Sequence, residues 1–224
     1  MSKKAIVYID GFNLYHGLKG KEWERYLWLD LPKVSAALLP SYCTLTRVRY
    51  FTSRVSSTPD DPGKANRQSA YIDVIKSLTP LVKVYEGSYQ SKQSHCKHCD
   101  TKVECQSCGR RHIKPNEKKT DVNLVTALFV DAIENVCDVQ VLISGDGDYE
   151  NALKELRRLF PSKELIIAFP PKRKNNKLIQ PDTHTSIIEM GDNEDWFAKS
   201  QFHDPFPVQI GNKRILIAKP TIWS

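Results

Sequence analysis

Two short apolar runs, each ending in an acidic turn, constrain the fold of this chain more than any other feature. The first covers residues 4–10 (KAIVYID) and leads into Gly11. The second covers residues 139–144 (VQVLIS) and leads into a Gly-Asp-Gly-Asp turn. Runs of this length, rich in β-branched residues and without polar alternation, predict strands that are buried on both faces. Such strands occur almost only in parallel sheets covered by helices.

Strand and helix patterns alternate along most of the chain. Further strands are expected at 45–54, 82–89, 165–169 and 186–190, and helices at 12–18, 31–39, 66–78, 120–136 and 149–160. This order favours a parallel sheet with helices on both faces. A terminal hairpin is expected at 207–218, turning at Gly211 and Asn212. With 224 residues, 40% of them hydrophobic, the chain can form the core of one α/β domain but not of two full-size domains.

Four aspartates are expected to meet at one edge of this sheet. Asp10, Asp146 and Asp148 follow strand ends, where open parallel sheets bind ligands, and Asp121 follows Thr120, a predicted helix N-cap. Clustered carboxylates repel one another unless a cation is present, and hard oxygen ligands suit Mg²⁺ or Mn²⁺. We therefore predict a divalent-metal site able to activate water for phosphodiester hydrolysis. Taken singly, each aspartate could also be a turn residue or a first-turn helix acid.

Four cysteines form two CxxC pairs separated by five residues: Cys96, Cys99, Cys105 and Cys108. They lie in a polar segment with almost no aliphatic residues, which predicts two knuckles around a structural zinc ion. Two alternatives stay open: His95, His98 or His112 in place of one cysteine, or redox chemistry. The paired spacing indicates a reducing, cytoplasmic compartment. No apolar stretch approaches the ~20 residues of a membrane helix.

Positive charge is concentrated in two segments. The net charge is +7, and residues 90–119 hold eight Lys or Arg against three Asp or Glu. Residues 172–177 add four cations and no acid. We expect the cations near the acidic residues to hold a phosphate backbone, with solvated loops as the alternative. These cations are Arg110, Arg111, Lys118 and Lys119 before Asp121, and Lys172, Arg173 and Lys174 after the strand at 165–169.

Three acidic blocks resemble a known family. Residues 8–15 (YIDGFNLY), 117–124 (EKKTDVNL) and 142–149 (LISGDGDY) are similar to the signature blocks of NYN-domain proteins, which are PIN-like nucleases and include the LabA-like branch. The third block usually carries Ser or Asn where this chain has Gly147. The similarity extends to residues 50–54, 67–68, 169–171 and 220–223, so it covers nearly the whole chain.

The resemblance implies a fold and a reaction. The fold is a PIN-like three-layer α/β/α sandwich with a mainly parallel central sheet, spanning residues 1–224 as one domain. Residues 91–116 would be an inserted zinc-knuckle module, and residues 200–224 a C-terminal extension or hairpin. The reaction is metal-dependent cleavage of RNA, single-stranded or structured, by Asp10, Asp121, Asp146 and Asp148.

The resemblance also implies roles for two neighbouring polar residues. Asn13 would orient a metal-bound water or the scissile phosphate, and Ser144 would support the site from behind. Two other functions stay open: a non-catalytic RNA-binding or regulatory module, and a metal-dependent phosphatase or nucleotidase acting on small phosphate esters. A homodimer also stays open.

Aromatic residues beside the acidic blocks are expected to be structural. Tyr15 and Tyr149 could stack on bases, but packing on a helix face is the favoured interpretation. His16 is interpreted as a surface or capping histidine rather than a general base.

Overall fold

A seven-stranded sheet forms the centre of the computed structural model, which describes residues 2–96, 98–109, 113–179 and 185–223. Its strand order is β4-β3-β2-β1-β5-β6-β7. Six strands are parallel: β1 (Lys3–Asp10), β2 (Cys43–Ser53), β3 (Val82–Gln93), β5 (Val139–Ile143), β6 (Glu164–Phe169) and β7 (Thr185–Glu189). The remaining strand, β4 (Ile113–Lys118), pairs antiparallel with the end of β3. The predicted α/β class and mainly parallel sheet are confirmed.

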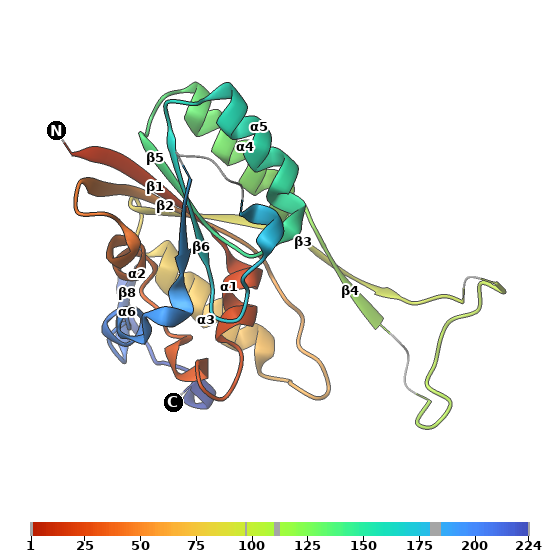
Figure 1. Ribbon diagram of the computed structural model, residues 1–224. Helices are drawn as coiled ribbons and strands as arrows, with labels where there is room; N and C mark the ends of the chain where they lie inside the picture. Colours follow the sequence, from red (N-terminus) through yellow and green to blue (C-terminus); the bar gives the residue numbers. More distant parts are fainter. Residues whose placement is uncertain (1, 97, 110–112, 180–184, 224) are drawn as a thin grey trace.

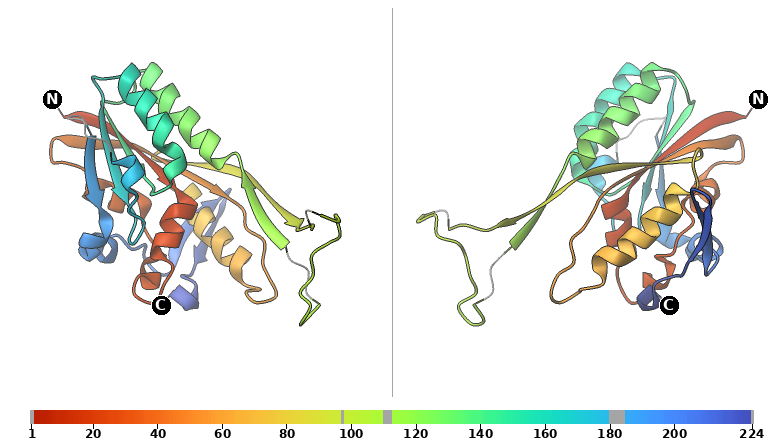
Figure 2. Two further views of the ribbon diagram at one scale, coloured as in Figure 1. Left: turned by 45° about the vertical axis from the view of Figure 1, so that its right-hand side comes forward. Right: turned by 180° about the vertical axis from the view of Figure 1, so that it is seen from behind.

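Helices cover both faces of the sheet (Figures 1 and 2). On one face lie α4 (Thr120–Ile133) and α5 (Glu150–Leu159), and on the other lie α1 (Gly11–Leu18), α2 (Leu31–Leu38), α3 (Lys64–Lys76) and α6 (Glu194–Lys199). Alternate side chains of β1 enter the two cores: Ile6 and Tyr8 pack with α4 and α5, whereas Val7 and Ile9 pack on the opposite face. From Ala5 to Ile9 the strand is apolar because both of its faces are covered.

Local sequence sets the helix starts on the α1 and α2 side. The Asp10 carboxylate accepts a hydrogen bond from the backbone N–H of Asn13 (3.0 Å), and the Asp30 carboxylate accepts one from Lys33 (3.1 Å). Both are N-cap contacts, and Pro32 occupies the first turn of α2. Asp10 therefore ends β1 and caps α1, so its position is fixed by two elements.

A two-stranded arm extends from the sheet (Figures 1 and 2). The end of β3 and β4 form a ladder that runs from Ser88 opposite Lys118 to Gln93 opposite Ile113. The sequence did not predict β4, because the strand is polar and its pairing depends on the backbone rather than on an apolar face. The cysteine segment connects the two strands at the far end of the arm.

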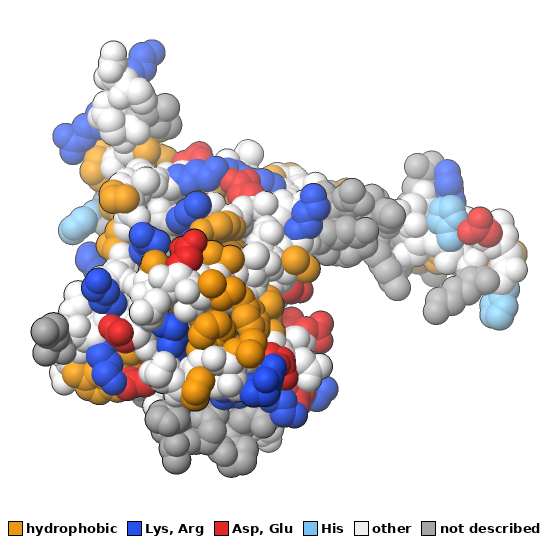
Figure 3. All heavy atoms as spheres, turned by 90° about the horizontal axis from the view of Figure 1, so that it is seen from above, with side chains coloured by type: hydrophobic (Ala, Val, Ile, Leu, Met, Phe, Trp, Pro, Cys, Tyr) orange, Lys and Arg blue, Asp and Glu red, His pale blue; other side chains and the backbone are white. Residues whose placement is uncertain are grey.

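The C-terminal region packs on the α3 face. The predicted hairpin is confirmed as β8 (Phe206–Ile210) and β9 (Lys213–Ile217), with Gly211 in the left-handed region at φ 57°. Val208 and Trp223 join the core there. The opposite side, seen from above α4 and α5, shows an apolar patch (Figure 3); the exposed apolar residues of these helices include Val130, Ile133 and Leu159. Among the described residues, no helix has both the length and the hydropathy needed to cross a membrane.

A buried ion pair ties α4 to the sheet. Asp131 of α4 is fully buried and accepts hydrogen bonds from Arg49 Nε of β2 (2.7 Å) and from the Tyr8 hydroxyl of β1 (2.6 Å). Gln140 of β5 donates to the Tyr8 hydroxyl (3.0 Å) and to the Leu128 carbonyl (2.9 Å). The helix that carries Asp121 is thus fixed to three neighbouring strands.

Candidate metal-binding and catalytic site

Three of the four aspartates gather at the carboxyl edge of the sheet. Asp10 is 5% exposed at the end of β1, half-buried Asp146 follows β5, and exposed Asp121 lies in the first turn of α4. The Ser144 hydroxyl donates to Asp10 Oδ2 (2.9 Å) and accepts from the backbone N–H of Asp146 (3.0 Å). Ser144 therefore joins two of the acidic residues from beneath.

Tyr149 links Asp10 to Asp121. Its hydroxyl lies 2.8 Å from Asp121 Oδ1 and 3.4 Å from Asp10 Oδ2. Burial raises the pKa of Tyr149 well above its usual value, and the carboxylates of Asp10 and Asp121 add to this rise, so the phenol stays a neutral donor. The sequence assigned Tyr149 to packing on a helix face. Its place directly after Asp148 was the available signal for a site role.

The electrostatics of the cluster favour a bound cation. Burial raises the pKa of Asp10 to about 6, and Asp121 and Asp146 add to the rise, although hydrogen bonds from Asn13 and Ser144 oppose it. Among the described residues, Oδ2 of Asp121 and Oδ2 of Asp146 accept no hydrogen bond. Buried negative charge and uncommitted carboxylate oxygens are what a hard divalent ion binds.

The protein does not supply a complete ligand cage. In the described part of the chain, no three acidic, histidine or cysteine side chains converge closely enough to hold an ion by themselves. Mg²⁺ is commonly bound through one or two carboxylates, with water and substrate phosphate completing its octahedron. Two carboxylates of the group Asp10, Asp121 and Asp146, completed by water and phosphate, would be enough for that mode of binding.

Asp148 lies beside the cluster rather than within it. It is exposed in the short helix η2 (Gly147–Tyr149), and its backbone N–H donates to Asp146 Oδ1 (3.0 Å). Among the described residues, no hydrogen bond joins the Asp148 carboxylate to the other three aspartates. The main chain at Asp148 thus orients Asp146.

Asn13 fixes the turn that carries Asp146. It is buried, and its Oδ1 accepts hydrogen bonds from the backbone N–H of Gly145 (2.9 Å) and from Arg173 Nε (3.3 Å). Asn175 Nδ2 in turn donates to the Gly145 carbonyl (3.0 Å). Sequence reasoning gave Asn13 a role toward water or phosphate, whereas in this structure its contacts are to the protein.

The three cations at 172–174 have different partners: two form ion pairs, and one contacts Asn13. Lys172 pairs with Glu22 (2.6 Å), and Lys174 pairs with Glu189. Arg173 alone contacts a residue of the acidic site, through Asn13. Arg173 is therefore the cation of this run best placed to meet a phosphate at the cluster.

Gly145 allows the 170–175 segment to cross the site. A Cβ atom there would lie 1.8 Å from the Arg173 carbonyl oxygen, so backbone must move to admit any side chain. We expect Gly145→Ala to lower the free energy of unfolding by about 1–3 kcal/mol. Gly191→Ala is the control, since its Cβ would meet Pro171 at an ordinary 3.5 Å. Urea denaturation of both variants checks this, and equal effects would contradict it.

The other predicted cations lie on the approach to α4. Lys119 is exposed, and its backbone adopts the left-handed conformation (φ 79°) at the N-cap of α4. Lys118 is the β4 residue that pairs with Ser88 of β3 in the antiparallel ladder. The prediction that Thr120 is the N-cap was wrong. Thr120 is the first helical residue, and its hydroxyl contacts the Ser53 hydroxyl (3.1 Å). Arg110, Arg111 and His112 lie outside the described residues.

The two cysteine pairs form matching turns. The backbone N–H of Asp100 donates to the Cys96 carbonyl (2.9 Å), and that of Gly109 donates to the Cys105 carbonyl (2.8 Å). Asp100 and Gly109 are both left-handed, at φ 53° and 66°. A hydrogen bond from Thr101 lowers the pKa of Cys99, and the backbone N–H of Ser107 lowers that of Cys105. The two pairs thus share one backbone geometry, and one thiol in each pair has a lowered pKa.

Three comparisons relate this chain to known proteins. A 6-hydroxy-3-succinoylpyridine 3-monooxygenase of Pseudomonas putida is 27% identical over 178 residues, which is 69% of this chain and 55% of that protein. The chain thus spans about half the length of this relative. A crystal structure of a Vibrio parahaemolyticus protein of unknown function covers 84% of this chain and 94% of its own, at 15% identity and a TM-score of 0.47. The NYN domain model matches residues 4–189, which include all four aspartates, and the chain therefore belongs to the NYN domain family.

Proposed function

We propose that this NYN domain is a metal-dependent ribonuclease whose centre is formed by Asp10, Asp121 and Asp146, with Asp148 beside them. The observation that carries the proposal is the hydrogen-bonded cluster at the sheet edge, in which Ser144 and Tyr149 hold three carboxylates beside Arg173. The NYN domain is a PIN-like nuclease family, which supports the same reaction class. The net charge of +7 favours a polyanionic substrate.

Each residue of the cluster has a task in hydrolysis. Asp10, Asp121 and Asp146 would hold Mg²⁺ or Mn²⁺, which, when bound, polarises the phosphate and lowers the pKa of water. Ser144 and Tyr149 orient the carboxylates, and Asn13 holds the turn in front of Asp146. Arg173, with Lys118 and Lys119 near the start of α4, would contact the phosphate backbone. Arg110 and Arg111 remain candidates for the same role.

The test is cleavage of RNA by purified protein. With Mn²⁺ or Mg²⁺ we expect cleavage of single-stranded RNA, loss of cleavage in EDTA, and recovery on adding metal back. Asp146→Asn should lower the rate by at least about a hundredfold, because removing even outer-shell partners of a metal costs 10–100-fold. RNA binding without cleavage would instead favour a binding module, and turnover of small phosphate esters alone would favour a phosphatase. Full activity in the Asp146→Asn variant would reject the site.

We also propose that Cys96, Cys99, Cys105 and Cys108 hold one structural zinc ion. The two matching turns, which present a pair of thiols each, support this. In the described residues the four thiols are not gathered around one point, so the metal would draw the two turns together. His95 is engaged with Asp100 (3.0 Å), which favours the cysteines as the ligand set.

Metal analysis checks the zinc proposal. We expect about one zinc per chain by elemental analysis, and loss of that zinc in a Cys99→Ser, Cys108→Ser double variant. Cys43→Ser, which changes a cysteine outside the segment, is the control and should retain the metal. Protein that contains no zinc after purification with added zinc salt would contradict the proposal. Equal zinc content in both variants would do the same.

A further inference from the structure

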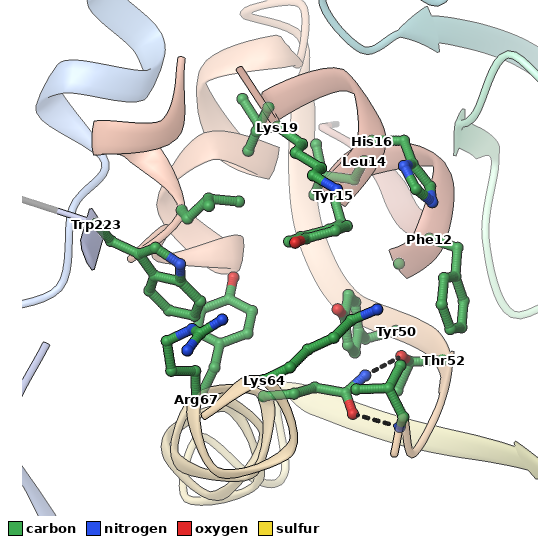
Figure 4. A pocket seen from close by; sticks show the side chains of 16 residues that line it. Phe12, Leu14, Tyr15, His16, Lys19, Tyr50, Thr52, Lys64, Arg67 and Trp223 are labelled. Carbon is green, nitrogen blue, oxygen red and sulfur yellow. Dashed lines mark hydrogen bonds between the residues drawn. The ribbon is translucent and has the colours of Figure 1, made fainter. Parts of the chain in front are cut away.

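A cavity lies against α1, on the face of the sheet that α1 and α3 cover (Figure 4). It has a volume of about 110 Å³ and is bounded by α1, the end of β2, α3 and the C-terminal Trp223. Its apolar lining consists largely of rings and leucines: Tyr15, Tyr50, Tyr71, Trp223, Leu14, Leu18 and Leu27. Such a surface suits a flat, apolar-faced ligand.

The cavity and the acidic cluster are formed by neighbouring residues at the same edge of the sheet. Gly11 lines the cavity and directly follows Asp10, so the two Cα atoms are about 3.8 Å apart. Thr52 also lines it and directly precedes Ser53, whose hydroxyl contacts Thr120 beside Asp121. Residues that line the cavity are therefore adjacent in sequence to Asp10 and to Ser53, at the sheet edge that carries the proposed catalytic site.

Cations border the cavity. Lys64 and Arg67 extend from α3 and Lys19 from the end of α1 (Figure 4). Arg67 pairs with Asp61 (2.5 Å), whereas in the described part of the chain Lys19 and Lys64 make no ion pair. Burial lowers the pKa of His16, and the nearby cations Arg173, Lys19 and Lys64 lower it further. The cavity is thus matched to an aromatic ring that carries an anion.

The volume of the cavity sets an upper bound on the ring. An apolar cavity on the order of 150 Å³ accommodates a benzene molecule, so a cavity of about 110 Å³ holds no more than one six-membered ring, and a fused pair would extend out of its open side. Aromatic walls stack with a nucleobase, and nearby cations bind its phosphate. The polar side chain of Gln68 is already engaged, because it bonds to the Ser53 carbonyl (2.9 Å) and to the Val55 N–H (2.8 Å).

From these observations we propose that the cavity binds a pyrimidine base of the RNA, next to the phosphodiester that the acidic cluster holds. This deepens the proposed ribonuclease function and rests on it for the identity of the polymer. The ring lies among Tyr15, Tyr50 and Trp223, and Lys64 and Lys19 contact its phosphate. Cleavage beside pyrimidines is then faster than cleavage between purines.

Binding without metal tests the cavity independently of cleavage. In EDTA, uridine or cytidine 5′-monophosphate should bind at least about tenfold more tightly than adenosine 5′-monophosphate by calorimetry. Lys64→Glu should weaken pyrimidine binding by about tenfold or more, as expected for loss of a charge-assisted contact. Lys213→Glu, with the same change of charge on exposed β9, should leave it unchanged. Bound pyrimidine should quench tryptophan fluorescence, and Trp223→Phe should remove most of that signal.

The outcomes separate the two proposals. Equal affinity for purine and pyrimidine nucleotides, or an unchanged affinity in Lys64→Glu, would overturn the cavity assignment even if RNA is cleaved. Selective pyrimidine binding by a protein that never cleaves RNA would support the cavity and reject the ribonuclease. Unchanged cleavage preference in Lys64→Glu and Trp223→Phe, with the overall rate intact, would also overturn it.

Discussion

Asp10→Asn should abolish cleavage and at the same time stabilise the metal-free protein. The substitution removes a carboxylate of the proposed metal site, so we expect a fall in rate of more than about a hundredfold. Asn can still accept the hydrogen bond from the Asn13 N–H and can meet the Ser144 hydroxyl, so the fold should persist. Loss of activity together with gain of stability would exclude unfolding as the cause.

The sign of the stability change follows from the pKa of Asp10. Burial raises it from its ordinary value of 3.8 to about 6. The protonated Asp10 carboxyl contributes to the stability of the fold. This contribution is fully present below pH 3.8 and is lost as the pH rises through about 6, and its loss lowers the free energy of unfolding by at most roughly 3 kcal/mol. At pH 8 without metal, Asp10→Asn should therefore be more stable than the wild type, by on the order of 1–3 kcal/mol. Near pH 4 the difference should nearly vanish.

Urea denaturation in EDTA at the two pH values measures this difference. Added Mn²⁺ should then raise the stability of the wild type but not of Asp10→Asn, because only the wild type keeps the full ligand set. Asp195→Asn, which changes an exposed aspartate paired with Lys199, is the matched control and should change neither stability nor cleavage. The stability difference between Asp10→Asn and the wild type should favour the variant more at pH 8 than at pH 4. The opposite order would show that the buried charge is not the dominant effect.

Asp131→Ala should produce the largest loss of stability. The carboxylate is completely buried and is the partner of Arg49 and Tyr8, so its removal leaves a buried guanidinium without compensation. Breaking such a pair costs about 3–5 kcal/mol. Because α4 carries Asp121, we expect cleavage to fall as well, through displacement of the helix rather than through loss of a ligand.

A paired variant separates charge from packing. Arg49→Met with Asp131→Leu removes both charges and keeps apolar volume, so it should recover much of the stability lost in Asp131→Ala. Chemical denaturation of the single and double variants measures the coupling. If Asp131→Ala loses less than about 1 kcal/mol, the ion pair does not hold α4 to the sheet as the structure indicates.

The architecture and the acidic positions follow from local sequence patterns. The mainly apolar runs at 4–10 and 139–144 predict buried parallel strands, because a segment covered on both faces favours apolar side chains. The turns after them place Asp10 and Asp146 at one edge, since carboxyl ends of parallel strands coincide. These are local hydrophobic patterns, and they can be recognised in the sequence without knowledge of the tertiary contacts.

Which side chains contact one another at this sheet edge depends on the tertiary structure. Tyr149 reaches both Asp10 and Asp121, whereas Asp148, one residue earlier, lies outside the hydrogen-bonded cluster. Within one basic run, Glu22 and Glu189 engage Lys172 and Lys174, and Arg173 is directed to Asn13. These assignments depend on partners more than a hundred residues away in several cases. The sequence around the aspartates thus predicted a group of carboxylates at one sheet edge, and long-range packing determined which side chains contact them.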